Sequence, residues 1–119
     1  MLSQVHLLLA YVSAATTALV AAEAGWRAFT NLPATRTARW LAAGQFASLV
    51  ATAIAGFALV ASGEAANNGL HYLMAVVALL SVPAAPMFST RAGPRGRALV
   101  TCFAGLFALA VVGLLFITG

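Results

Sequence analysis

The basic residues are confined to two short parts of this chain, and that restriction limits the folds that it can adopt. All six basic residues are arginines, and they lie in two groups, within residues 27–39 and 91–97. Around these groups run four long apolar stretches, and Glu23 is the only acidic residue that adjoins one. Each stretch is near the ~20 residues that a helix needs to cross the hydrocarbon core of a bilayer. The sequence therefore predicts an integral membrane protein with four transmembrane spans.

The predicted spans cover residues 4–24, 39–62, 70–88 and 98–118, within one domain of residues 1–119. We expect helices, because a backbone in hydrocarbon must satisfy its own hydrogen bonds. The connections are short, so successive helices should be antiparallel neighbours. Only 7% of residues are charged, against about 25% in soluble domains. The predicted fold class is all-α, an up-down-up-down four-helix transmembrane bundle.

The positions of the arginines also predict an orientation. Short loops rich in arginine are retained in the cytoplasm. In an inner (cytoplasmic) membrane, both termini and the loop with Glu64 would then lie on the non-cytoplasmic side. The net charge of +4 is explained by topology and anionic lipid, so the expected partner is the bilayer and no nucleic acid.

Turn and cap residues mark the ends of the spans. Thr35 or Thr37 can cap the second helix, and Asn67-Asn68-Gly69 predicts a turn before the third. Pro83 and Pro86 are expected to kink the third helix or to end it early.

Small residues predict which helix faces pack, because helices in lipid associate by close approach. The second span has the clearest stripe, with Gly44, Ser48, Thr52 and Gly56 at four-residue spacing. The other spans have shorter stripes: His6, Ala10, Ser13, Thr17 and Ala21; His71, Ala75 and Ala78; Cys102, Gly105 and Ala108. Both histidines of the chain lie on such a face, so we expect them to point into the bundle.

The two histidines form the candidate site. His6 and His71 begin the first and third spans, on the same side of the membrane and at similar depth. In a bundle connected in order these helices are diagonal, so the two imidazoles could supply both axial ligands of a haem iron. The small residues one and two turns further in are Ala10, Ser13, Ala75 and Ala78, which would leave room for a flat macrocycle.

Three segments carry a resemblance to a known family. They are Gln4-Val-His6-Leu-Leu-Leu-Ala10-Tyr, the glycine-containing helix 45–63, and Leu70-His71-Tyr-Leu-Met-Ala75. In this order they resemble the four-helix haem unit of heme A synthase and cytochrome b561-type proteins. The resemblance spans most of the chain and implies haem b held between His6 and His71.

The chain departs from that family in three ways. It has one histidine pair and so at most one haem, and it has no glutamate near His6, so synthase chemistry is not expected. The histidine side also has no arginine or lysine to pair with haem propionates. That role would fall to the terminal amine and to Gln4, Asn67, Asn68 and Tyr72.

Other readings of the same residues remain open. Histidines close to an interface can simply reach the headgroups, and Met74 is an alternative axial ligand one turn from His71. A structural zinc site is not expected, because zinc takes four ligands and Cys102 lies toward the other face. Gln45 is interpreted as a hydrogen-bonding residue between helices rather than a quinone contact.

The leading functional hypothesis is a haem b-binding electron-transfer subunit, not an enzyme by itself, that works with quinone or with other membrane subunits. The alternative is a cofactor-free accessory subunit of a larger membrane complex. A third hypothesis is a small proton-coupled transporter, because a four-span chain with one membrane glutamate, Glu23, resembles small multidrug transporters. Against it, Glu23 lies four residues before Arg27, where a surface ion pair is favourable.

Overall fold

A computed structural model of the chain describes residues 1–64 and 68–118, apart from the side chain of residue 118, and within them it contains α-helices and no strands. The four helices are α1 (Leu2–Thr30), α2 (Arg36–Ala61), α3 (Gly69–Phe88) and α4 (Pro94–Thr118). All four are long and apolar enough to cross a membrane. The expected turn at Asn67 lies outside the described residues.

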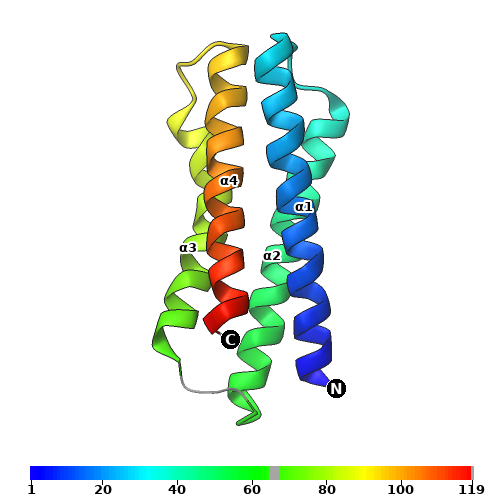
Figure 1. Cartoon of the computed structure of the whole chain (residues 1–119), viewed down its shortest axis with the longest axis vertical. Coiled ribbons are helices and arrows are strands. Elements are labelled where there is room, and N and C mark those ends of the chain that lie inside the picture. The colour runs from blue at the N-terminus through cyan, green and yellow to red at the C-terminus, as the bar shows by residue number, and fades with distance from the viewer. Residues whose placement is uncertain (65–67, 119) are drawn as a thin grey trace.

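The helices form an up-down-up-down bundle, which confirms the predicted fold class. The connections α1–α2 and α3–α4 lie together at one end, and the end of α2 and the start of α3 lie at the other end, with the start of α1 and the end of α4 (Figure 1). All six arginines therefore lie near the end that holds the α1–α2 and α3–α4 connections. We call it the arginine end, and the opposite one the histidine end.

Helix α1 is longer than the predicted span, because it continues past residue 24 to Thr30. Its 29 residues measure about 44 Å at 1.5 Å per residue, so it is longer than the ~30 Å hydrocarbon core. Asn31, in the left-handed conformation with φ 55°, ends the helix. Helix α2 then begins with Thr35 as its cap, whose side chain accepts a hydrogen bond from the amide of Ala38 at 3.2 Å.

Helix α3 runs through both of its prolines to Phe88, so the prediction that they could end it early is wrong. Each proline still removes an amide, so the carbonyls of Leu79 and Val82 lose the usual helical donor four residues later.

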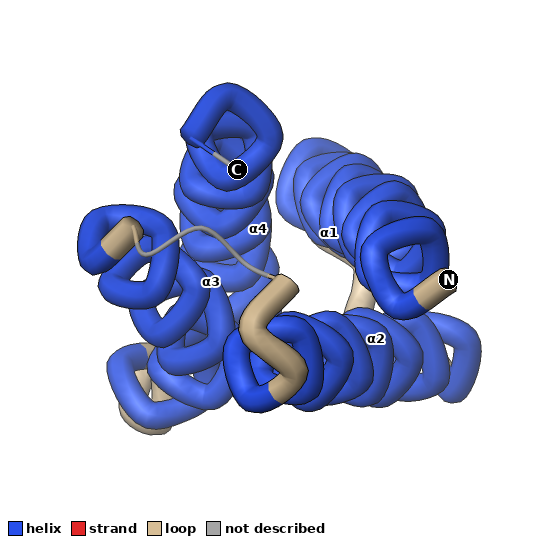
Figure 2. Tube along the Cα trace, turned by 90° about the horizontal axis from the view of Figure 1, so that it is seen from below, coloured by secondary structure: helices blue, strands red, loops and turns tan. Residues whose placement is uncertain are grey.

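The order of the helices around the bundle is α1, α2, α3, α4, as the view from the histidine end shows (Figure 2). Helix α1 packs extensively on α2 and α4, and α3 packs extensively on α4. By contrast, α2 and α3 touch only sparsely. Among the described residues α1 has no backbone contact with α3, so these two helices are diagonal, as expected.

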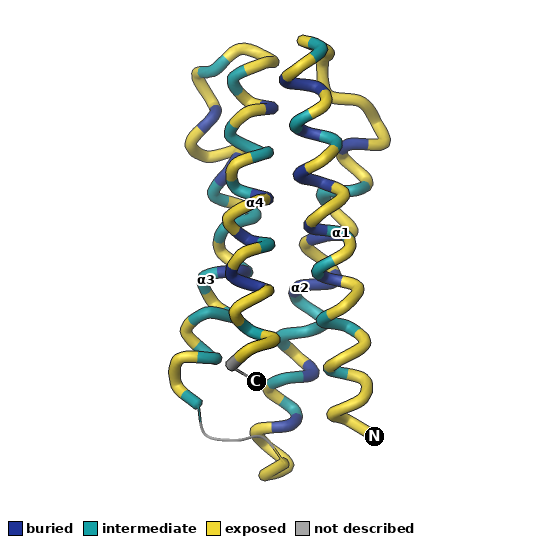
Figure 3. Tube along the Cα trace, in the orientation of Figure 1, coloured by how far each residue is buried: buried dark blue, intermediate teal, exposed yellow. Residues whose placement is uncertain are grey.

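Buried positions line the inward sides of the helices, and exposed positions cover the outside (Figure 3). Most buried apolar residues are alanine or valine, with Leu49 and Leu59 as the larger exceptions. The largest fully buried side chains are those of Thr17 and Ser13, while Phe29 and Phe88 are 80% and 85% exposed. This distribution suits lipid, in which helices associate by close packing rather than by burying large apolar groups. At one tight contact, a Cβ atom on Gly105 of α4 would lie 2.9 Å from the Cβ of Ala21 in α1.

One part of the predicted stripe in α2 is wrong. Ser48 is buried and Gly56 contacts α1, but Gly44 is exposed, and a Cβ atom there would have nothing within 4 Å. A helix has 3.6 residues per turn, so each four-residue step rotates by about 40°. Gly44 is two such steps from Thr52 and has turned out of the interface.

Candidate functional site

The structure brings His6 of α1 and His71 of α3 together across the bundle. Their ring centres are 6.4 Å apart and the rings are inclined at 57°. Both side chains are half-buried, near the histidine end. His71 lies in the first turn of α3, and its amide donates to Oδ1 of Asn68, the cap of that helix, at 3.4 Å. The cap therefore fixes the start of α3 and with it the depth of His71.

A hydrogen bond from α1 to α2 orients the imidazole of His6. Its Nδ1 lies 3.2 Å from the main-chain carbonyl oxygen of Thr52. A carbonyl can only accept, so Nδ1 carries the proton, and in the neutral ring the lone pair available to a metal is on Nε2. Histidines that bind metals typically donate their other ring N–H to a carbonyl or carboxylate in this way.

The small residues predicted to border a macrocycle lie in two different settings. Ala10 and Ala75 are half-buried, one turn from the histidines. Further in, the hydroxyl of Ser13 is hydrogen-bonded to that of Thr52 at 2.9 Å. Ala78 belongs to an apolar cluster at mid-bundle. That cluster consists of Leu49, Ala78, Val111 and Val112, with Met74 packed against it.

The spacing of the two imidazoles can be compared with that of two ligands on opposite sides of one metal ion. Two imidazoles bound in line to one metal, each through a nitrogen at about 2 Å, have ring centres about 6 Å apart. The observed 6.4 Å agrees with that arrangement. Within the described residues no group of three or more histidine, cysteine or acidic side chains could hold a metal ion, so the pair is the available donor set. Among the described residues, the candidate partners of haem propionates at the histidine end are the terminal amine, Gln4, Asn68 and Tyr72, and no arginine or lysine lies there.

A second polar region runs between α1 and α2. Ser13 bonds to Thr52, the hydroxyl of Thr16 lies 3.0 Å from that of Ser48, and Nε2 of Gln45 donates to Oγ1 of Thr17 at 3.3 Å. This confirms Gln45 as a hydrogen-bonding residue between helices.

The hydroxyls between α1 and α2 do not form a continuous proton path. Thr52 donates to the carbonyl of Ser48, and Ser48 donates to the carbonyl of Gln45. Because these hydroxyl protons are donated to main-chain oxygens, we interpret the region as a set of hydrogen bonds that stabilises the α1–α2 interface.

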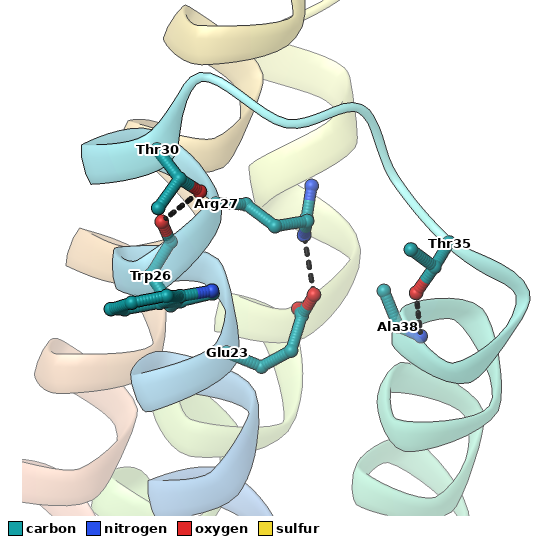
Figure 4. Close-up of polar contacts among 6 residues, drawn as sticks. All are labelled: Glu23, Trp26, Arg27, Thr30, Thr35 and Ala38. Carbon is teal, nitrogen blue, oxygen red and sulfur yellow. Dashed lines mark hydrogen bonds and ion pairs between the residues drawn. The ribbon is translucent and has the colours of Figure 1, made fainter.

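At the arginine end, Glu23 and Arg27 form the ion pair that their spacing predicts, with 2.6 Å between Oε1 and Nε. Both side chains project from α1 toward the first turn of α2 (Figure 4). The expectation of a surface pair is wrong, because the side chains of Arg27 and Glu23 are only 10% and 24% exposed. They line a partly open cavity of about 480 Å³.

Sequence reasoning did not predict this cavity. Three polar residues on apolar helices, Glu23, Arg27 and Gln45, could have indicated it. Whether their side chains face the same space depends on how α1 and α2 are rotated about their axes. That rotation follows from close contacts such as Gly105 on Ala21, which a single sequence does not reveal.

The fold defines the class of the protein: a multi-pass membrane protein with four transmembrane helices. Comparison of the chain with protein-family models, with curated proteins and with solved structures finds no match.

Proposed function

We propose that this protein is a haem b-binding electron-transfer subunit, with His6 and His71 as the axial ligands. The observation that carries the proposal is the 6.4 Å spacing of the two rings across diagonal helices. The hydrogen bond from His6 to the Thr52 carbonyl supports it, because it leaves Nε2 as the basic nitrogen.

The chain's own residues have distinct parts in this proposal. A bound haem would supply one-electron chemistry, by cycling between ferric and ferrous iron. His6 and His71 hold the group, and the Thr52 carbonyl holds His6 in one tautomer. Gly56 leaves the space that the His6 ring occupies. The apolar cluster of Leu49, Ala78, Val111 and Val112 lies further into the bundle and would present an apolar surface to the bound group.

We further propose that the arginine end faces the cytoplasm in an inner membrane, which puts the histidine end and both termini on the other side. Electrons would then be exchanged near the outer surface, with a quinol or with another membrane subunit.

The test is a reduced-minus-oxidised absorption spectrum of the protein, purified after expression with ample haem. We expect a haem b-type spectrum in the wild type and in Ser3→Ala, a control at an exposed position of the same turn. The spectrum should be lost in His6→Ala and in His71→Ala. External imidazole should restore it in His6→Gly, because a ligand role can be rescued in this way and a packing role cannot.

A flat spectrum in the wild type would overturn the proposal and favour the accessory-subunit hypothesis. Proteins that co-purify with the chain would then be the next measurement.

The transporter hypothesis has one supporting observation, that Glu23 lines a cavity between the helices. Its carboxylate is already paired with Arg27, which favours a structural role over a proton-binding one. If Glu23→Gln abolished proton-coupled substrate binding while histidine changes did little, this hypothesis would replace the haem proposal.

A further inference from the structure

The cavity at the arginine end is separate from the histidine pair and draws its lining from all four helices. It holds about 480 Å³. Its polar and charged lining residues are Glu23, Arg27, Arg39, Gln45, Ser81, Ser89, Arg97 and Thr101. The remaining lining is alanine, valine, proline, phenylalanine and glycine. The cavity therefore combines an apolar wall with a charged end.

The charges around this cavity do not balance. Three arginines line it, Arg27, Arg39 and Arg97, against one carboxylate, that of Glu23, which leaves an excess of two positive charges. Glu23 is engaged by Arg27, in the one ion pair between side chains that the described residues form. Arg97 donates to the carbonyls of Ala92 and Thr90 at 3.0 and 3.4 Å, which steadies its side chain without neutralising it. The uncompensated cations favour an anionic ligand.

The apolar wall reaches the lipid-facing surface between α2 and α3. Phe46 of α2 and Pro83 and Pro86 of α3 line the cavity and are also exposed. This is the seam where the two helices touch only sparsely. A ligand could therefore hold a polar head inside the bundle while an apolar tail leaves sideways into the bilayer.

We propose that this cavity binds the phosphate headgroup of an anionic phospholipid, whose acyl chains pass between α2 and α3. Basic pockets between transmembrane helices recognise such headgroups by charge. Arg39 and Arg97 would pair with the phosphate, since guanidinium groups match its oxygens in a bidentate manner. Arg27 and Glu23, which are paired with each other, line the same cavity.

The experiment measures lipid binding to the purified full-length protein by native mass spectrometry and by thermal unfolding. Phosphatidylglycerol is compared with phosphatidylcholine and with glycerol 1-phosphate, which has a phosphate and no acyl chains. We expect phosphatidylglycerol to stay bound and to raise the unfolding temperature, and the other two to do neither.

The variant is the double substitution Arg39→Gln/Arg97→Gln, and the matched control is Arg91→Gln/Arg95→Gln. Both remove two charges from the same end at exposed positions, but only the first pair lines the cavity. At about 1 kcal/mol for each cation near a membrane surface, the variant should bind phosphatidylglycerol about thirtyfold more weakly, and the control should bind like the wild type.

Three results would overturn the proposal. An equal loss in both double variants would mean surface attraction without a site. Equal binding of phosphatidylcholine would remove the requirement for an anion. Equally tight binding of glycerol 1-phosphate would make the ligand a free phosphate compound rather than a lipid.

Discussion

The imidazole of His6 lies where a side chain on Gly56 would be. A Cβ atom built on Gly56 would come within 3.1 Å of Cε1 of His6 and 3.5 Å of its Nδ1. Nδ1 is the atom that donates to the Thr52 carbonyl, one turn earlier on the same helix. Helix α2 therefore positions His6 in two ways. The Thr52 carbonyl accepts a hydrogen bond from the ring, and Gly56 leaves the space that the ring occupies.

Gly56→Leu should disturb the candidate site, because the longer side chain must displace the His6 ring. We expect loss or a marked shift of the haem absorption, measured on purified protein. Gly44→Leu is the matched control on the same helix, since its Cβ would meet nothing within 4 Å. If the two variants had the same spectrum as the wild type, the contact between α2 and His6 would have no part in the site.

Gly105→Ala should destabilise the bundle through the α1–α4 interface. The added methyl would lie 2.9 Å from the Cβ of Ala21 and 3.2 Å from its Cα, so the two backbones must separate. Overpacking of this kind costs about 1–3 kcal/mol. Thermal unfolding in detergent measures it, with Gly113→Ala of the same helix as a control that meets nothing within 4 Å. Equal unfolding temperatures for the two variants would contradict the close packing.

Glu23→Gln should destabilise the protein more than the double substitution Glu23→Gln/Arg27→Gln. The single change leaves the buried guanidinium of Arg27 without its counterion. An unsatisfied buried polar group costs about 1–3 kcal/mol, and a charged group costs more. The double change removes that charge as well. Free energies of unfolding in denaturant give the comparison, and a double variant less stable than Glu23→Gln would show that the pair does not act as a unit.

Gln45→Leu should weaken the α1–α2 interface modestly. It removes the bond to Thr17, and such bonds inside membranes are worth about 0.6 kcal/mol on average and up to about 1.7 kcal/mol. A double-mutant cycle with Thr17→Val isolates the pair by unfolding free energy. A coupling energy of zero would assign the stability of this interface to packing alone.

The proposed orientation can be tested by chemical labelling in a Cys102→Ser background. A maleimide that does not cross membranes should label Ser3→Cys in intact cells, because this position is at the histidine end. Arg95→Cys, at the arginine end, should react only after the cells are opened. The reverse pattern would invert the proposed topology.

Much of the fold followed from the sequence, because a bilayer imposes strong constraints. Long apolar stretches predicted the number of helices, and short loops predicted their antiparallel order. Thr35 and Thr37 were both candidate caps of α2, and the structure uses Thr35. The diagonal placement of His6 and His71 followed from connectivity alone. The rotation of each helix about its own axis did not follow from the sequence. The exposure of Gly44 and the burial of Arg27 both depend on this rotation, which shifts by about 40° for every four residues.

Because α2 and α3 touch only sparsely, two helices that are consecutive in the sequence are not close packing partners. Among the described residues α1 packs extensively on α4, the last helix, while the consecutive helices α2 and α3 touch only sparsely. A chain divided between residues 62 and 68 would yield two hairpins that keep the α1–α4 interface intact. The single polypeptide thus consists of two different helical hairpins, α1–α2 and α3–α4, which pack against each other mainly through α1 and α4.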